Sequence, residues 1–233
     1  MTTAKIEIAF QSFWFVGTGR EAGVYADSIP VKRTLVSESG IPVPVPCVPG
    51  KTVKGMFRAA FQTAGGNGWF GTQQEAEKLE HRLFGQPGPD KLSEQSPGQP
   101  GPDRPAEQSP GKSGNPGILH FSMLEISPAL KTYLRKEPDA AGELFRTVKS
   151  TAIDPDTGTA KNKSLREYEV VVPLTLTGEI SFCEDGIGDP ELPGARELTE
   201  KLNQVAALIT ELGGRRTRGF GQCVITVREE PRK

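Results

Sequence analysis

The sequence predicts an α+β protein whose core is ferredoxin-like, or RRM-like, with the element order βαββαβ. Four segments repeat apolar residues at every second position, which is typical of strands that bury one face. Two segments repeat them every three or four positions, which is typical of helices with one buried face. Elements in this order form an antiparallel sheet with both helices on one face. Because many unrelated functions use this plan, the function has to be inferred from particular residues.

The first predicted strand covers residues 5–16, where Ile6, Ile8 and Phe10 share one face. A glycine-containing loop follows it. Residues 31–36 are expected to be extended, and a turn is expected after them. Prolines at positions 42, 44, 46 and 49 exclude a helix in the next stretch.

The first predicted helix starts after Pro49 and Gly50. Its apolar positions are Val53, Met56, Phe57, Ala60, Phe61 and Ala64. Their spacing puts them on one face, and the pair Gly65-Gly66 is expected to end the helix. Residues 73–84 predict a second, more polar helix.

The second half of the chain supplies the remaining elements. Leu119, Phe121 and Met123 alternate in the second predicted strand, residues 174–182 predict the third, and residues 223–227 predict the last. A helix is predicted between the last two strands. Its apolar positions are Leu198, Leu202, Val205, Ile209 and Leu212. Two glycines follow and are expected to end it.

Two insertions interrupt this core. Residues 86–116 are rich in Pro, Gly, Ser and Gln and hold a tandem duplication, QPGPDKLSEQSPG followed by QPGPDRPAEQSPG. Such a composition buries too little apolar surface to offset the entropy of ordering, so we expect a mobile surface loop. Residues 144–170 are polar and contain the turn sequence DPDTG, which predicts a projecting hairpin. The chain as a whole, residues 1–233, is expected to form one domain.

Composition limits the classes of function and location. The formal net charge of -1 argues against binding through overall charge, but grouped basic residues can still form a local phosphate-binding surface. Cys47, Cys183 and Cys223 form no CxxC pair, so we expect buried thiols rather than a disulfide framework or a zinc site. No segment has the pattern of a signal peptide or the length of a membrane span. We therefore expect a cytoplasmic protein with no membrane partner.

The most specific motif is GGRRTRGFG, residues 213–221, between the last predicted helix and strand. Arginines supply forked donors that match phosphate oxygens, and glycines let the backbone approach a polyanion closely. The predicted RNA-binding residues here are Gly214, Arg215, Arg216, Arg218, Gly219 and Phe220. Among the aromatics Trp14, Phe15, Trp69 and Phe220, only Phe220 is nominated to stack on a base. The alternative is an ordinary exposed basic turn.

A second basic group lies at the start of the first predicted helix. Lys51, Lys54 and Arg58 stand where free N–H groups and the helix dipole favour an anion. These three residues are therefore predicted to bind phosphate. The alternative is that they are ordinary solvated helix residues.

These motifs together resemble those of the RAMP superfamily of CRISPR-associated proteins. GGRRTRGFG is similar to the glycine-rich loop of that family, VPGKTVKGMFR to its helix start, and RLFG to the end of its next helix. Residues 144–170, with Ile153 and Asp154, are similar to its thumb-like insertion. The resemblance implies a subunit of a type III effector complex that binds guide RNA (crRNA), meets target RNA through the thumb, and packs against copies of itself or other CRISPR-associated subunits.

The resemblance also implies a catalytic residue. YADSIPV, residues 25–31, is similar to the stretch that holds an aspartate needed for metal-dependent cleavage of target RNA. Asp27 is therefore the candidate catalytic residue and the candidate protein contact of a Mg²⁺ ion. The alternative is that Asp27 is only a turn residue.

Other functions remain open at this point. The chain could be a non-cutting scaffold or capping subunit of the same superfamily. It could be a stand-alone endoribonuclease that processes precursor RNA, although His81 and His120 form no obvious acid-base pair for that chemistry. The simplest alternative is a ferredoxin-like protein whose basic loop binds a small anion.

Overall fold

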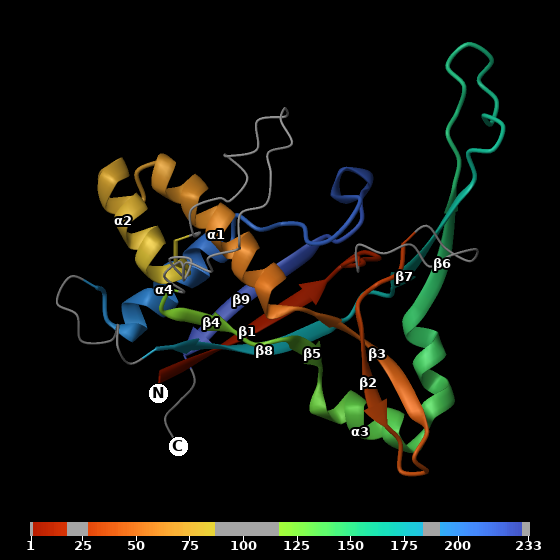
Figure 1. Ribbon diagram of the computed structural model, residues 1–233, viewed down its shortest axis with the longest axis horizontal. Coiled ribbons are helices and arrows are strands. Elements are labelled where there is room, and N and C mark those ends of the chain that lie inside the picture. The colour runs from red at the N-terminus through yellow and green to blue at the C-terminus, as the bar shows by residue number, and fades with distance from the viewer. Residues whose placement is uncertain (1, 18–27, 87–116, 184–191, 230–233) are drawn as a thin grey trace, which may run out of the picture.

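The computed structural model describes residues 2–17, 28–86, 117–183 and 192–229. Within these residues, seven strands form one antiparallel sheet in the order β2-β3-β5-β8-β1-β9, and β4 pairs with β8 as β5 does (Figure 1). The strands are β1 (Thr2–Phe10), β2 (Lys32–Val36), β3 (Pro42–Val48), β4 (Leu119–Phe121), β5 (Leu124–Ile126), β8 (Thr175–Phe182) and β9 (Cys223–Glu229). The predicted combination of an antiparallel sheet with helices is confirmed.

The register of β1 places one apolar face of the sheet against the helices. Ile8 of β1 lies opposite Leu176 of β8 and Ile225 of β9, and all three side chains are buried. Lys5 and Glu7 alternate with the buried residues of β1 and lie on the other face. A shift of the register by one residue would exchange the two faces, so the alternating pattern determines the pairing.

Three helices lie over one face of the sheet (Figure 1). They are α1 (Gly50–Gly66), α2 (Gln73–Phe84) and α4 (Ala195–Ala206). Gly50 is the first residue of α1. A Cβ at this position would lie 2.0 Å from the carbonyl oxygen of Phe121, so no larger residue fits this close to β4. α2 starts with a capping box between Thr72 and Glu75. None of the helices in the described part of the chain is long and apolar enough to cross a membrane.

The last helix is shorter than predicted. Apolar spacing predicts a helix as far as Leu212, but α4 ends at Ala206. The carbonyl of Thr210 instead accepts a hydrogen bond of 2.9 Å from the N–H of Cys223, which pairs this segment with the edge of β9. Ile209 and Leu212 are still buried, so the apolar pattern was right about burial and wrong about helix length.

Two predicted strands are interrupted. The strand predicted over residues 5–16 ends at Phe10, where the chain leaves β8 for other partners. The second strand divides into β4 and β5, because Ser122 bonds to Glu179 through both its N–H (2.9 Å) and its Oγ (2.8 Å). This local distortion turns Met123 outward to 40% exposure, so its predicted place in the core is wrong.

The proline-rich stretch forms a strand rather than a loop. Cys47 donates its N–H toward β2, to the carbonyl of Val31. Backbone N–H groups point to opposite sides at successive positions of a strand. Pro42, Pro44 and Pro46 occupy the positions that alternate with Cys47, so their nitrogens point away from β2. Because proline has no N–H, it costs no ladder hydrogen bond on that side.

A two-stranded hairpin stands away from the main sheet (Figure 1). It consists of β6 (Phe145–Ser150) and β7 (Arg166–Val171), and it follows α3 (Pro128–Lys136) and the 3-10 helix η1 (Pro138–Leu144). The DPDTG turn closes near its tip, where Asp154 Oδ1 accepts from the N–H groups of Asp156 (3.0 Å) and Thr157 (3.1 Å). The sequence did not predict α3, although Ser127 caps it and a proline opens it.

The cysteines agree with the prediction in two cases out of three. All three thiols are free, and Cys47 and Cys223 are buried. Cys183, the residue after the end of β8, is exposed, so the prediction that it is buried is wrong. Of the duplicated insertion, residues 86–116, all but Gln86 lie outside the described residues.

Candidate nucleic-acid interface

The glycine-arginine loop, residues 213–221, is closed at its base by backbone contacts that require glycine. Leu212 donates its N–H to the carbonyl of Gly221 at 2.8 Å. Gly221 has φ 76°, and a Cβ there would lie 2.0 Å from the oxygen of Leu212. Gly213 has φ 104°, and its Cβ would lie 2.3 Å from the oxygen of Phe15. Side chains are therefore excluded from both ends of the loop.

The loop lies along the segment Phe13 to Phe15. Gly214 donates its N–H to the carbonyl of Phe15 at 2.9 Å, and Gly221 donates to the carbonyl of Phe13 at 2.8 Å. A Cβ on Gly214 would come within 2.4 Å of the Phe15 ring, so this glycine permits close packing. Gly214 was predicted to let a polyanion approach, and the structure gives it an additional, structural reason.

The same segment joins the loop to the hairpin. Trp14 and Val171 of β7 exchange two backbone hydrogen bonds, of 3.1 Å and 2.7 Å. Arg215 then crosses the junction, with its guanidinium carbon 3.5 Å from the centre of the Tyr168 ring. It also donates to the Tyr168 hydroxyl and, at 3.2 Å, to Ser150 Oγ. Arg215 is therefore held by β6 and β7.

A hollow of about 230 Å³ lies between the glycine-arginine loop and the outer end of the β6-β7 ladder, where Ser150 pairs with Arg166. Its lining residues are Ser150, Thr151, Ala152, Ser164, Arg166, Arg215 and Arg218. Arginine guanidinium groups and hydroxyl groups are donors that suit phosphate oxygens. The sequence did not single out Arg166, because its place beside the loop depends on the pairing of β6 with β7.

The tip of the loop is open to solvent. Residues 216–219 are exposed, and Gly219 takes φ 79° to end a short 3-10 turn. Arg216 also borders a groove of about 640 Å³ that runs along α1 beside Thr52 and Gly55. The structure thus brings the loop next to the first two turns of α1.

The three basic residues of α1 have different surroundings. Lys51 is exposed at the helix start, and Lys54 is half-buried. Burial lowers the pKa of Lys54, and the positive charge of Arg58 lowers it further. Arg58 itself forms an ion pair with Glu80 of α2 and donates to the carbonyl of Gly85 at 2.9 Å. Arg58 thus links α1 to α2. Because Glu80 is only 4% exposed, its carboxylate needs a charged partner, and this favours a structural role for Arg58.

The aromatic candidates are mostly packed inside. Trp14 is fully buried and stacks on Phe10 with ring centres 4.1 Å apart. Phe15 is buried, and Phe220 packs partly against the cluster that Phe15 forms with Tyr168. The sequence prediction overlooked Phe13, the exposed aromatic at this junction.

Asp27, the predicted catalytic residue, lies outside the described residues. Its neighbour Ser28 forms a parallel bridge with Tyr168 and accepts a hydrogen bond of 3.2 Å from the N–H of Glu169. Among the residues that the structure does describe, no group of three or more His, Cys, Asp or Glu side chains is placed to hold a metal ion. A Mg²⁺ site therefore rests on the sequence resemblance alone.

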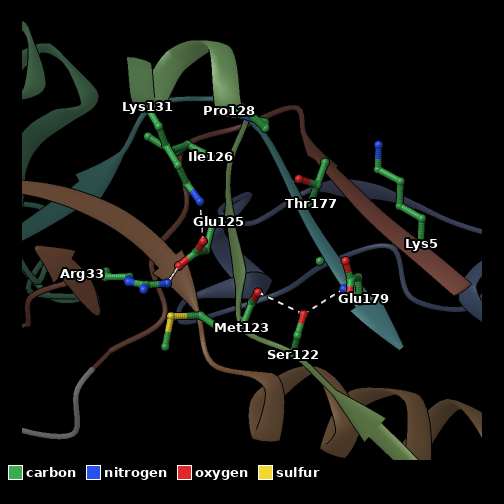
Figure 2. A pocket seen from close by; sticks show the side chains of 11 residues that line it. Lys5, Arg33, Ser122, Met123, Glu125, Ile126, Pro128, Lys131, Thr177 and Glu179 are labelled. Carbon is green, nitrogen blue, oxygen red and sulfur yellow. Dashed lines mark hydrogen bonds and ion pairs between the residues drawn. The ribbon is translucent and has the colours of Figure 1, made fainter. Parts of the chain in front are cut away.

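A second hollow, of about 390 Å³, is lined by residues of the sheet together with Pro128 and Lys131 of α3 (Figure 2). Figure 2 shows the carboxylate of Glu125 between Arg33 and Lys131, and both form ion pairs with it. Burial lowers the pKa of Lys131, and the nearby positive charges of Arg33 and Arg135 lower it further by smaller amounts. Because its acidic and basic groups pair with one another, this hollow is less suited to a polyanion than the loop.

Comparison with known proteins adds one finding. The sequence model described as the RAMP superfamily matches residues 7–224, which include both the α1 start and the glycine-arginine loop. A comparison with curated proteins finds no match.

Proposed function

The chain belongs to the RAMP superfamily, and from this membership we propose that it is a guide-RNA-binding subunit of a type III CRISPR effector complex. The observation that carries the proposal is the contact of the glycine-arginine loop with the outer end of the β6-β7 ladder. There, Arg166, Arg215 and Arg218 line one hollow together with three hydroxyl-bearing side chains. RNA gains most of its sequence-independent affinity from such phosphate contacts.

The two exposed arginines supply the charge for this contact. Arg216 and Arg218 project from the tip of the loop, and neither side chain takes part in the ion pairs of the described residues. Arg215 contributes chiefly by positioning the loop, since its guanidinium is engaged with Tyr168. Gly219 lets the chain turn at the tip without a side chain in the way.

The start of α1 extends the proposed surface. Lys51 and Lys54 lie at the helix N-terminus, where N–H groups and the helix dipole favour a phosphate. The groove along α1 that Arg216 borders connects this end of the helix with the loop. One strand of RNA could therefore run from the helix start to the hollow beside the outer end of the β6-β7 ladder.

We further propose that the core is ferredoxin-like and that the hairpin is the thumb. The antiparallel order β5-β8-β1-β9, with α1 after β1 and α4 after β8, supports the first assignment. Exposed Ile153, at 60%, and Asp154 near the hairpin tip support the second. An exposed apolar residue on a projecting hairpin can insert between the stacked bases of a guide-target duplex.

We propose Asp27 as the residue required for metal-dependent cleavage of target RNA. Its support is the similarity of residues 25–31 to the corresponding stretch of the family. A non-cutting scaffold or capping subunit is the second candidate, because the RNA-binding features serve that role equally well.

The test is to purify the full-length tagged chain from cells that carry its CRISPR locus and to sequence the RNA that copurifies. A guide-binding subunit should retain RNAs of defined length that match the locus, and other CRISPR-associated subunits should copurify. A stand-alone processing enzyme should instead be an active monomer that cleaves precursor RNA without metal. Absence of locus-derived RNA from a folded, assembled chain would contradict the proposal.

A further inference from the structure

Phe13 lies between the end of β1 and three consecutive buried residues, Trp14, Phe15 and Val16. Trp14 points into the core and is fully buried against Phe10. Phe15 is covered by Gly214 and by the ring of Tyr168, 6.3 Å away between ring centres. Phe13, the residue before them, is 41% exposed.

Packing does not explain this ring. The hydrophobic clusters of the described residues include Trp14, Phe15 and Phe220, but not Phe13. Phe13 also takes part in none of the ring pairs and cation-π contacts among the described residues. A lone exposed apolar residue is common on protein surfaces, so exposure alone would mean little.

The backbone around Phe13 is held more firmly than at an ordinary surface position. The carbonyl of Phe13 accepts from Gly221 at 2.8 Å, and Ser12 Oγ accepts from the N–H of Gln222 at 3.0 Å. Gln11 donates to the carbonyl of Gln222 at 2.8 Å. These bonds hold the backbone of Phe13 at the base of the glycine-arginine loop. Binding of a ligand to the ring would therefore cost little conformational entropy of the backbone.

We propose that Phe13 stacks on an unpaired base of the RNA whose phosphates the glycine-arginine loop binds. This inference rests on the proposed RNA-binding function and adds a contact to the base. Every nucleobase has a π face, and an aromatic ring beside a basic groove is a typical platform for single-stranded RNA. A phenylalanine ring has no hydrogen-bonding group, so it does not discriminate between bases. This property suits an RNA whose sequence varies.

The test compares two ligands and three variants of the full-length chain. The ligands are a single-stranded RNA and an abasic ribose-phosphate oligomer of the same length, which keeps the phosphates and lacks the bases. Phe13→Leu keeps the apolar bulk and loses the ring, Phe13→Trp keeps a ring, and Tyr133→Leu removes an aromatic that is 53% exposed on α3. Phe13→Leu should weaken RNA binding roughly tenfold and leave binding of the abasic oligomer unchanged. Phe13→Trp and Tyr133→Leu should bind both ligands like the unchanged chain.

The outcomes separate the two proposals. If the unchanged chain prefers RNA to the abasic oligomer and Phe13→Leu keeps that preference, the stacking role of Phe13 is overturned and the binding function stands. If Phe13→Leu weakens binding of both ligands equally and also lowers the melting temperature, Phe13 is a packing residue. If the unchanged chain binds neither ligand, the proposed function itself fails.

Discussion

Arg215 stacks on Tyr168, with its guanidinium carbon 3.5 Å from the centre of the ring. Through this contact, a loop near the C-terminus holds a hairpin that lies 47 residues earlier in the chain. The hollow proposed to bind phosphate lies beside this contact, so the shape of the interface depends on the pair.

Breaking this pair should loosen the junction. Arg215→Ala loses the cation-π contact and the hydrogen bonds to Tyr168 and Ser150, which should cost about 2 kcal/mol in the free energy of unfolding. Arg215→Lys should be nearly as unfavourable, because lysine lacks the planar fork. Urea unfolding of Arg215→Ala, Tyr168→Ala and the double variant should give a coupling free energy of about 1 kcal/mol. Additive losses would show that the two side chains act independently.

The exposed arginines should determine salt-dependent RNA binding. Replacing both Arg216 and Arg218 by alanine should weaken binding of every RNA sequence, because each lost phosphate contact reduces counterion release. The slope of log affinity against log salt should become shallower by about 1.4 for a single strand. The matched control is Arg135→Ala with Lys136→Ala, two exposed basic residues of α3. An unchanged slope in the folded loop variant would remove the loop from the interface.

Arg58 can be assigned to packing or to RNA by a pair of variants. Arg58→Ala leaves the buried carboxylate of Glu80 without its partner, which should cost about 2 to 4 kcal/mol in the free energy of unfolding. Glu80→Gln removes the ion pair and keeps Arg58. If Arg58 is structural, both variants should melt earlier and neither should change RNA affinity at a temperature where they are folded. Weaker RNA binding by Arg58→Ala alone would restore its predicted place in the interface.

The cysteines should differ in reactivity and in their effect at high pH. Burial raises the pKa of the Cys223 thiol to about 11, and burial also raises that of Cys47. The exposed Cys183 should therefore react first with an alkylating reagent at pH 8, as mass spectrometry of the folded chain would show.

The same pKa shift predicts a loss of stability in alkali. The unfolded chain releases the Cys223 proton near pH 9 and the folded chain only near 11. The stability associated with Cys223 is thus fully present below pH 9 and is lost as the pH rises toward 11. Cys223→Ala should lose less stability than the unchanged chain between these values in urea unfolding. Equal losses would contradict the assignment.

Asp27 should decide whether the complex cuts. Asp27→Asn keeps the shape and removes the charge, so it should abolish Mg²⁺-dependent cleavage of a complementary target while assembly and target affinity persist. A target with a 2'-deoxy sugar at the cut position is the control, because it lacks the attacking hydroxyl. If cleavage survives in Asp27→Asn, or if the unmodified complex does not cut, the chain is a non-cutting scaffold.

The sequence by itself determined the features that depend on local interactions. The bounds of α2, residues 73–84, follow from a capping box and apolar spacing within a few residues of each other. The start of α1 follows from a proline and a glycine, and the glycine-arginine loop is recognisable because its residue types are rare in combination. Apart from Arg166, the arginines and glycines proposed to contact RNA could therefore be named before the fold was known.

Only the tertiary structure decided which of these residues are available. Arg58 is engaged by Glu80 from another helix, and Arg215 by Tyr168 from the hairpin. The strand predicted over residues 5–16 leaves the sheet after Phe10, and this departure is what exposes Phe13 beside the loop. Such outcomes depend on hydrogen bonds and packing between residues far apart in the chain. Local periodicity reports that a side chain is apolar or charged, but its partner is determined by which distant segments the fold brings together.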